Sequence, residues 1–306
     1  MSSDYRLLSY RDAKGAQAGV LVGGYVYPAA KLLKGSGVDA SSVLAILQGW
    51  TKAHRALSKA ASKVKLKDGK PLAKVKLLAP ILYPAALFCA GANYWDHMEE
   101  MARVKGDTID RSKRPREPWF FLKTSAHSII GPGAPAHLPA NSQQVDWEAE
   151  LGVVIGKPAR NVSVAKAMDY VAGYTIVHDL SARDLMKRTD RAPVMTFDWV
   201  GQKCFDDAAP MGPWIVPASA IKDVGNLTVK LWVNGVLKQN SNTNQLIHNV
   251  PEQVAYLSEH VTLKPGDVIA TGTPAGVGMP RGEFLKKGDV VKIEIEGCGT
   301  LINPMV

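Results

Sequence analysis

Two glutamates separated by a single residue are the strongest chemical signal in this chain of 306 residues. Glu148 and Glu150 stand in the segment Val-Asp-Trp-Glu-Ala-Glu-Leu-Gly-Val-Val-Ile-Gly, whose apolar end predicts a strand. Alternate side chains of a strand point to the same face, so the two carboxylates should lie side by side. Neighbouring carboxylates repel each other unless a cation or a shared proton lies between them, and a divalent metal ion is the usual solution.

A third carboxylate extends this set of oxygen ligands. Asp179 ends the next apolar run, Tyr-Val-Ala-Gly-Tyr-Thr-Ile-Val-His-Asp, and the set contains no cysteine. Such a set suits a hard ion. The alternative is that the Glu-x-Glu pair lies on the solvated face of an edge strand, but residues 151–155 are too apolar for a fully exposed strand. We therefore predict that Glu148, Glu150 and Asp179 bind a metal ion.

Other polar side chains could act on a substrate near such an ion. His97 and Glu100 are three residues apart, so on a helix they share a face, where the carboxylate would orient the imidazole as a general base; exposed helices also carry such pairs. Lys203 stands in an apolar neighbourhood and could stabilise a developing negative charge. The glycine-rich segment 271–278 lacks the lysine of a phosphate-binding loop, and it would offer backbone N–H groups and the Thr273 hydroxyl to an oxyanion.

The residues after Asp179 permit more than one interpretation. Arg183 could hold a carboxylate of the substrate or order the metal ligands. It could also pair with its neighbour Asp184, and the sequence slightly favours this local ion pair.

Composition indicates a globular protein and argues against several partners. The chain is 46% hydrophobic with 27 Gly and 19 Pro, and no apolar run is long enough to span a membrane. The formal net charge of +9 comes from dispersed lysines and arginines without interleaved aromatic residues, so we expect no nucleic-acid partner. The N-terminus lacks the basic and then apolar layout of a signal peptide, which predicts a cytoplasmic protein.

The pattern of the elements predicts two domains, a small N-terminal β/α domain at 1–80 and a β-rich catalytic domain at 81–306. In the first, residues 5–30 should form two or three strands, and Ser41-Ser42 should open a helix that reaches Trp50. A lysine-rich stretch then leads to Pro80. In the second domain, we expect strands at Ile215, 227–234, 268–271 and 290–296, and helices at about 96–104, 164–168, 181–187 and 250–259.

Five segments follow one another in a characteristic order. They are Gly91–Met101 with the pattern Gly-x-Asn-Tyr-x-x-His-x-x-Glu-Met, Glu148-x-Glu150, Asp179-Leu-Ser-Ala-Arg-Asp184, Lys203 with Asp206, and Gly272-Thr-Pro-x-Gly-Val-Gly278. Taken together, these segments resemble the fumarylacetoacetate hydrolase family. The resemblance implies an α+β, β-rich fold in which a mixed β-sandwich roll forms the catalytic domain, an N-terminal extension found in a subset of members, and a homodimer. It also implies that the two glutamates and Asp179 bind Mg²⁺, Mn²⁺ or Ca²⁺, and that His97 and Glu100 sit on a lid that orders when ligand binds. Tyr94, Arg183 and Thr273 are then expected to contact the substrate.

One position departs from the family pattern. Many members that cleave acylpyruvates carry a glutamine that touches the substrate where this chain has Met186. A thioether makes no strong hydrogen bond, so Met186 would favour a less polar substituent on the substrate. The alternative is that Met186 turns into the core and does not meet the substrate.

The sequence thus predicts a metal-dependent hydrolase that cleaves a C–C bond of a β-diketo acid of the acylpyruvate or fumarylpyruvate type, in aromatic-compound or keto-acid catabolism. His97 and Glu100 would activate water, while Lys203 and Thr273 would stabilise the oxyanion. The same motifs also suit a decarboxylase of a 2-oxo acid such as oxaloacetate, or a 2-hydroxydienedioate isomerase, neither of which needs water. A binding protein without catalytic activity is a third alternative. It is disfavoured because the three acidic residues and the His97/Glu100 pair are all present. In each enzyme the substrate is a small 2-oxo or 2,4-dioxo acid.

Overall fold

A large mixed sheet runs through the molecule from the N-terminal strands to the strands that carry the acidic residues. The structure, a computed structural model, describes residues 5–306. Within them this sheet has 12 strands in the order β4-β3-β2-β1-β13-β11-β10-β16-β6-β7, while β5 pairs with β1 and β8 with β13. Its strands are β1 (Arg6–Asp12), β2 (Gly15–Val22), β3 (Tyr25–Pro28), β4 (Lys70–Pro71), β5 (Lys76–Leu77), β6 (Leu87–Gly91), β7 (Trp119–Lys123), β8 (Ile129–Ile130), β10 (Ala149–Ile155), β11 (Val171–His178), β13 (Ala209–Pro217) and β16 (Val268–Ala270).

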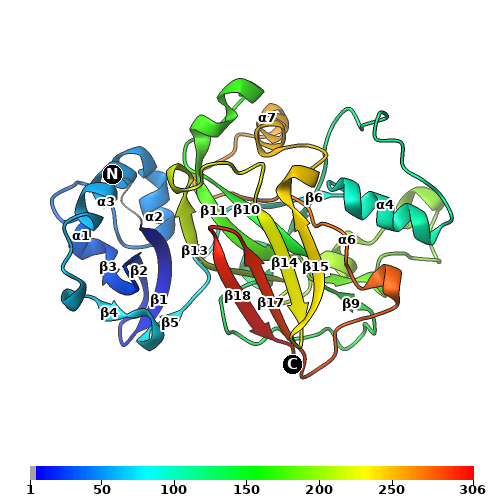
Figure 1. Ribbon diagram of the computed structural model, residues 1–306, viewed down its shortest axis with the longest axis horizontal. Coiled ribbons are helices and arrows are strands. Elements are labelled where there is room, and N and C mark those ends of the chain that lie inside the picture. The colour runs from blue at the N-terminus through cyan, green and yellow to red at the C-terminus, as the bar shows by residue number, and fades with distance from the viewer. Residues whose placement is uncertain (1–4) are drawn as a thin grey trace.

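Residues 5–30 contain three strands, β1 to β3, as the alternating pattern predicts, and three helices pack beside them (Figure 1). The helices are α1 (Ala29–Leu32), α2 (Val43–Gln48) and α3 (Trp50–Ala61). Ser42 caps α2, because its hydroxyl accepts a hydrogen bond of 3.0 Å from the backbone N–H of Ala45. The prediction of one helix ending at Trp50 is wrong: the chain breaks at Gly49 and continues as α3, so Lys52 and Lys59 belong to a helix.

The N-terminal part shares a core with the rest of the molecule. Strand β1 pairs antiparallel with β13, where Leu7 faces Ile215. Trp50 lies so close to the body that a Cβ at Gly156 would stand 2.6 Å from its ring, which only glycine avoids. One buried cluster includes Leu7, Trp50 and Ile215 together with residues of β10 and β11. A domain boundary at residue 80 stays a prediction.

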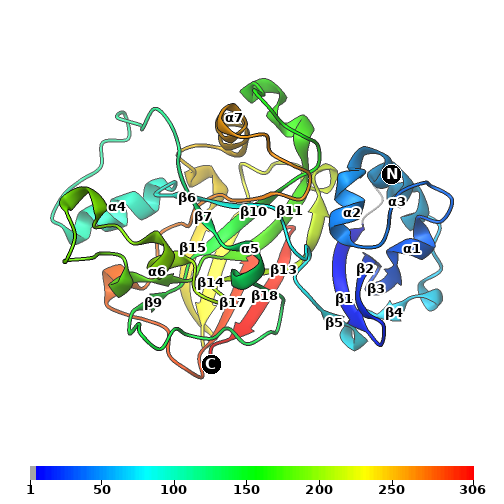
Figure 2. The ribbon, with the colours of Figure 1, turned by 180° about the vertical axis from the view of Figure 1, so that it is seen from behind.

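A second sheet packs across the large one and closes the core. It has four strands in the order β15-β14-β17-β18. Leu231 and Ile293 of this sheet share a buried cluster with Val153 and Tyr174 of β10 and β11. Figure 1 shows this sheet in front of β10 and β11, and Figure 2 shows it behind them. The predicted α+β, β-rich fold is therefore confirmed. The four strands are β14 (Thr228–Val233), β15 (Val236–Asn242), β17 (Val290–Ile295) and β18 (Gly299–Pro304).

Helices lie at the rim of the sheets. The predicted helices at 96–104 and 250–259 are present as α4 (Trp95–Val104) and α7 (Val250–His260), and Asn249 and Glu252 form a capping box for α7. The segment 164–168 is a 3₁₀ helix (Val164–Tyr170). The remaining α-helices are short, α5 (Ser125–Ser128) and α6 (Trp199–Lys203). Further 3₁₀ helices are Leu66–Asp68, Leu72–Lys74, Pro193–Met195, Ala218–Ala220, Thr243–Gln245 and Met279–Arg281.

The helix predicted at 181–187 is wrong. Ser181–Ala182 form β12, which pairs with β9 (Val145–Asp146), and Arg183–Leu185 form one 3₁₀ turn. The backbone N–H of Arg183 also donates to the carbonyl of Gln144. Backbone groups that a helix would use are thus hydrogen-bonded to the adjacent segment 144–146 of the same chain. Within residues 5–306, no helix is both long enough and apolar enough to cross a bilayer.

Candidate active site

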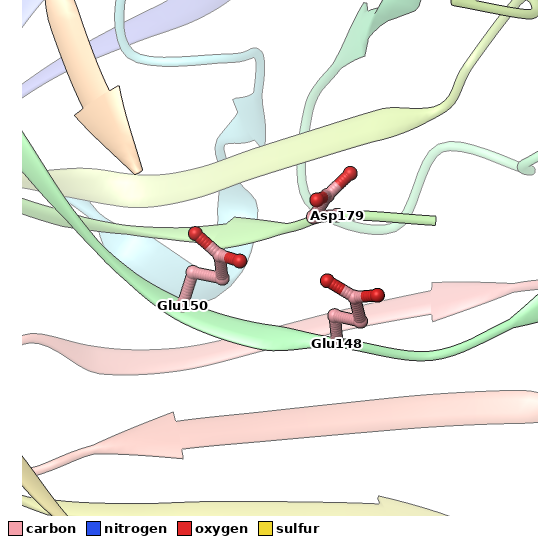
Figure 3. Close-up of side chains that lie close together, drawn as sticks. All are labelled: Glu148, Glu150 and Asp179. Carbon is pink, nitrogen blue, oxygen red and sulfur yellow. The ribbon is translucent and has the colours of Figure 1, made fainter. Parts of the chain in front are cut away.

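Three buried carboxylates converge where β10 begins and β11 ends. Ala149 faces His178 in this antiparallel pair, which places Glu148 and Glu150 beside Asp179, the residue after β11. The backbone N–H of Asp179 donates to the carbonyl of Glu148 over 3.0 Å and fixes this register. Each residue contributes one carboxylate oxygen to a group whose atoms all lie within 4.8 Å of one another. Figure 3 shows both glutamate side chains on one side of their strand, pointing toward Asp179.

Glu150 lacks a positive partner of its own. Its Oε2 accepts a hydrogen bond of 2.8 Å from the N–H of Gly272, and among the described side chains no cation forms an ion pair with it. Burial, followed by the charges of Asp179 and Glu148, raises the pKa of Glu150 well above its ordinary value. A buried carboxylate in this situation needs a proton or a cation. Three converging carboxylates can bind a divalent metal ion, and this donor set suits a hard cation.

Two buried lysines hold the other two carboxylates. The Nζ of Lys203 lies 2.6 Å from Asp179 Oδ2, 2.6 Å from the Ser181 hydroxyl and 3.3 Å from each oxygen of Glu148. Burial lowers the pKa of Lys203, but Asp179 and Glu148 outweigh burial and raise it. For the Glu148 carboxylate burial acts in the opposite direction and raises the pKa. The charges of Lys203 and Arg183 outweigh burial, so the pKa of Glu148 is lowered. Lys203 therefore serves as a counter-ion here, and its predicted action on a substrate oxyanion stays a prediction.

The second lysine, Lys123, was not predicted from the sequence. It is the last residue of β7, forms an ion pair with Asp179 Oδ1, and donates to the carbonyls of Leu180 and Ala208 over 2.8 and 2.7 Å. Its signal in the sequence is a single lysine at the end of the apolar run Trp-Phe-Phe-Leu-Lys. Lys123 is the only buried residue of β7, and a buried lysine must find acceptors inside the protein; here one of them is a carboxylate of the acidic group.

Arg183 does not pair with Asp184, so the interpretation that the sequence slightly favoured is wrong. Its Nε donates to Asp146 over 2.9 Å and its Nη2 to Glu148 over 2.5 Å. Asp184 instead accepts hydrogen bonds from the hydroxyl of Ser142 and the N–H of Gln143. The β9–β12 pairing turns Arg183 toward Glu148, which agrees with the alternative that Arg183 orders the metal ligands.

His97 and Glu100 lie on one face of α4, as their spacing predicts. His97 Nδ1 is 3.9 Å from Glu100 Oε2, beyond hydrogen-bond length. The same oxygen accepts a hydrogen bond of 2.9 Å from the N–H of Gly276. Burial raises the pKa of Glu100, but His97 and the Gly276 N–H outweigh burial and lower it, which favours the ionised carboxylate.

Six of the predicted residues line a single cavity of about 150 Å³. They are His97, Glu148, Arg183, Met186, Lys203 and Thr273. Met186 therefore faces the cavity rather than the core. The lining also includes four aromatic residues that were not predicted, Trp119, Phe121, Phe197 and Trp199, whose rings pack against one another.

Tyr94 is not among the residues that line this cavity. Its side chain is fully buried at the start of α4, and its hydroxyl has no hydrogen-bond partner among the described residues. Glu100, Glu150 and Asp179 do not line the cavity either. Glu150 and Asp179 lie buried beside Glu148, which does.

The fold and the buried acidic group define the class of protein. The family described as fumarylacetoacetate (FAA) hydrolase, C-terminal, matches residues 86–306, and the chain belongs to the fumarylacetoacetate hydrolase family. It is an enzyme of that family. This membership confirms the resemblance seen in the five motifs.

Particular relatives differ in the reactions that their names describe. An oxaloacetate tautomerase of Xenopus laevis, described as mitochondrial, is 46% identical over 236 residues, which are 76% of this chain and 69% of that protein. A maleylpyruvate hydrolase from Sphingobium sp. SYK-6, solved with Mn²⁺ and pyruvate, is 30% identical with a TM-score of 0.76 over 98% of each chain. A 2-hydroxyhepta-2,4-diene-1,7-dioate isomerase from Mycobacterium marinum is 34% identical with a TM-score of 0.71 over 98% of each chain.

Proposed function

We propose that this enzyme moves a proton between carbon and oxygen of a small 2-oxo acid, with oxaloacetate and its enol as the substrate pair. The observation that carries the proposal is the cavity of only about 150 Å³ that His97, Thr273 and Glu148 line. Sites for drug-sized ligands span roughly 300–1,000 Å³, so this one suits a compact acid. The 46% identity to a protein described as an oxaloacetate tautomerase supports the same choice.

A divalent ion, Mg²⁺ or Mn²⁺, would be held by Glu148, Glu150 and Asp179 and would polarise the 2-oxo group. The residues of the chain then supply the proton chemistry. His97 faces Glu100 through Nδ1, so Nε2 is the nitrogen that would take a proton from the carbon next to the 2-oxo group. As the C–H bond breaks, its electron pair becomes the C=C bond of the enolate. The Thr273 hydroxyl stabilises the charge on oxygen, and return of the proton from His97 to that oxygen completes the enol and regenerates the base.

This proposal replaces water activation as the role of His97 and Glu100. Hydrolysis of a β-diketo acid remains the second candidate, because the Sphingobium relative is described as a maleylpyruvate hydrolase and shares the fold over 98% of the chain. Decarboxylation of oxaloacetate would instead break the C3–C4 bond, release CO₂ and leave the enolate of pyruvate.

One panel of substrates separates these reactions. Deuterium uptake at C3 of oxaloacetate, followed by NMR in the presence of Mn²⁺ or Mg²⁺, measures proton transfer. Release of pyruvate and a carboxylic acid from acylpyruvates measures hydrolysis, and release of CO₂ measures decarboxylation. We expect rapid deuterium uptake with slow C–C cleavage. Rapid cleavage of acylpyruvates without uptake into oxaloacetate would reverse the assignment.

We also propose that the protein is a homodimer, which analytical ultracentrifugation would test. The cytoplasmic location and the lack of nucleic-acid and membrane partners stay predictions from the sequence.

A further inference from the structure

Gln239 of β15 connects three segments that meet at the candidate site. The side chain is fully buried. Its Oε1 accepts a hydrogen bond of 2.9 Å from the N–H of Ala149, the residue between the two glutamates. Its Nε2 donates to the Thr273 hydroxyl over 2.9 Å and to the carbonyl of Pro274 over 2.8 Å. One side chain thus joins the strand of the metal ligands to the glycine-rich loop.

The backbone partners determine which way this amide points. The N–H of Ala149 can only donate, and the carbonyl of Pro274 can only accept. Rotating the amide by 180° would place two donors against each other and two acceptors against each other in a fully buried position. The NH₂ group must therefore face Pro274 and Thr273.

This orientation controls the hydroxyl of Thr273. Because Nε2 donates to Thr273 Oγ1, the oxygen acts as an acceptor in that bond and its own proton must point elsewhere. Among residues 5–306, this is the only hydrogen bond of the Thr273 hydroxyl. Thr273 lines the cavity together with His97 and Lys203, so an acceptor on a bound ligand can receive the proton.

We infer that Gln239 is a positioning residue that keeps the Thr273 hydroxyl available as a hydrogen-bond donor to the anionic oxygen of the substrate. The inference rests on the proposed function, in which that oxygen gains charge as the proton leaves carbon. A donor that is already oriented stabilises this charge without first reorganising.

The sharpest test reverses the hydrogen bond. In Gln239→Glu the NH₂ group becomes an oxygen, and the Thr273 hydroxyl would turn to donate to it. Thr273→Val removes the hydroxyl and keeps the shape of the side chain. We expect each variant to lower kcat about 10²-fold, the cost of one lost oxyanion donor, while KM changes by a few-fold at most. The double variant should be no slower than Thr273→Val, because Gln239 acts through the hydroxyl.

A second variant guards against a folding defect in Gln239→Glu. Gln239→Met has a similar volume and no charge, and it leaves the hydroxyl free to rotate rather than turned away. It should therefore be slowed less than Gln239→Glu. Thr175→Val is the matched control, since it makes the same exchange at a buried residue of β11 whose hydroxyl has no hydrogen-bond partner among the described residues. That control should keep the wild-type kcat.

Losses that multiply in the double variant would overturn the inference, because Gln239 would then act independently of Thr273. The wild type, Gln239→Glu, Thr273→Val and the double variant are also titrated with oxalate in the presence of Mn²⁺ by calorimetry. We expect oxalate to bind to each of these two single variants about tenfold more weakly than to the wild type, the value of one hydrogen bond. It should bind to the double variant no more weakly than to Thr273→Val. This titration decides the role of Gln239 even if the wild-type protein does not exchange oxaloacetate, a result that would refute only the proposed function.

Discussion

Two glutamates of one segment have opposite protonation behaviour, because their neighbours differ. Glu148 lies between Lys203 and Arg183, which lower its pKa despite burial. Glu150 faces the other carboxylates, which add to the effect of burial and raise its pKa. Of the two, Glu150 therefore has more to gain from a cation.

This difference makes Glu150→Gln the most direct test of the metal site. An amide is a weak ligand for a hard cation, so we expect calorimetric binding of Mn²⁺ or Mg²⁺ to be lost. The fold should persist, because the change removes a buried negative charge. Glu294→Gln, at an exposed residue of β17, is the control and should bind the ion normally. Unchanged affinity in Glu150→Gln would exclude Glu148, Glu150 and Asp179 as the binding site.

Met186 gives a prediction about specificity. It lines the cavity, where a glutamine could hydrogen-bond a polar group of the substrate and a methionine cannot. Met186→Gln should raise kcat/KM for an acetyl substrate relative to a bulky acyl substrate by roughly tenfold, about the value of one buried hydrogen bond. The comparison uses both substrates with both proteins. If the ratio of the two kcat/KM values stays the same, Met186 does not select the substrate.

Side chains whose partners lie far away in the sequence were the hardest to predict. The side-by-side placement of Glu148 and Glu150 could be predicted, because alternate residues of a strand share a face whatever the rest of the fold. Lys123 and Gln239 could not, since each reaches the site only through the pairing of strands far apart in the chain. Arg183 was misassigned for a similar reason: its partner Asp146 lies 37 residues away.

At the scale of elements, helix α4 is attached to the glycine-rich loop. Asp96 of α4 accepts hydrogen bonds from the Ser241 hydroxyl and, over 3.3 Å, from the N–H of Ala275. Glu100 accepts from Gly276, one residue further along. The helix and the loop should therefore move as one unit when the site opens.

Within this unit, His97 is the side chain that should carry the proton. His97→Ala should lower the rate of deuterium uptake by about 10²–10⁴, the usual contribution of a general base. Oxalate affinity should change by a few-fold at most, since the base acts on the reacting carbon. Arg103→Ala, at an exposed residue of the same helix, should leave both unchanged. Parallel loss of rate and oxalate affinity in His97→Ala would instead indicate a structural or binding role.

For the whole molecule, the sequence predicts the fold class better than the arrangement of strands. The apolar runs of β10 and β11 are visible in the sequence because both strands are buried on both faces. The parallel pairing of β6 with β16 is not visible, although it brings residues 87–89 beside 268–270. This pairing brings the segment before α4 beside the glycine-rich loop, where the side chain of Asn93 donates to the carbonyl of Thr271 over 2.8 Å.

The buried His178 predicts how stability depends on pH. Burial, and then the charge of Lys123, lower the pKa of His178 to about 3. The unfolded chain binds a proton there below about pH 6.5, whereas the folded protein does not, so His178 favours unfolding progressively as the pH falls from 6.5 toward 3. Between pH 7.5 and 5.5 this residue should cost about 1.4 kcal/mol of the free energy of unfolding.

Urea unfolding with a metal chelator present measures this dependence. His178→Gln cannot titrate in this range, so its free energy of unfolding should fall less between the two pH values than that of the wild type, by that amount. An equal fall in both proteins would mean that other groups cause the acid sensitivity.

The pairing of β1 with β13 has a further consequence. Without the N-terminal strands, the edge of β13 would be open, and apolar residues of the shared core, such as Ile215, would lose their cover. An open apolar strand edge is a template on which another chain can add its own strand, the first step of aggregation. The N-terminal strands therefore protect the molecule from aggregation: far from the reacting atoms, they cover the edge of β13 and prevent it from pairing with a strand of another molecule.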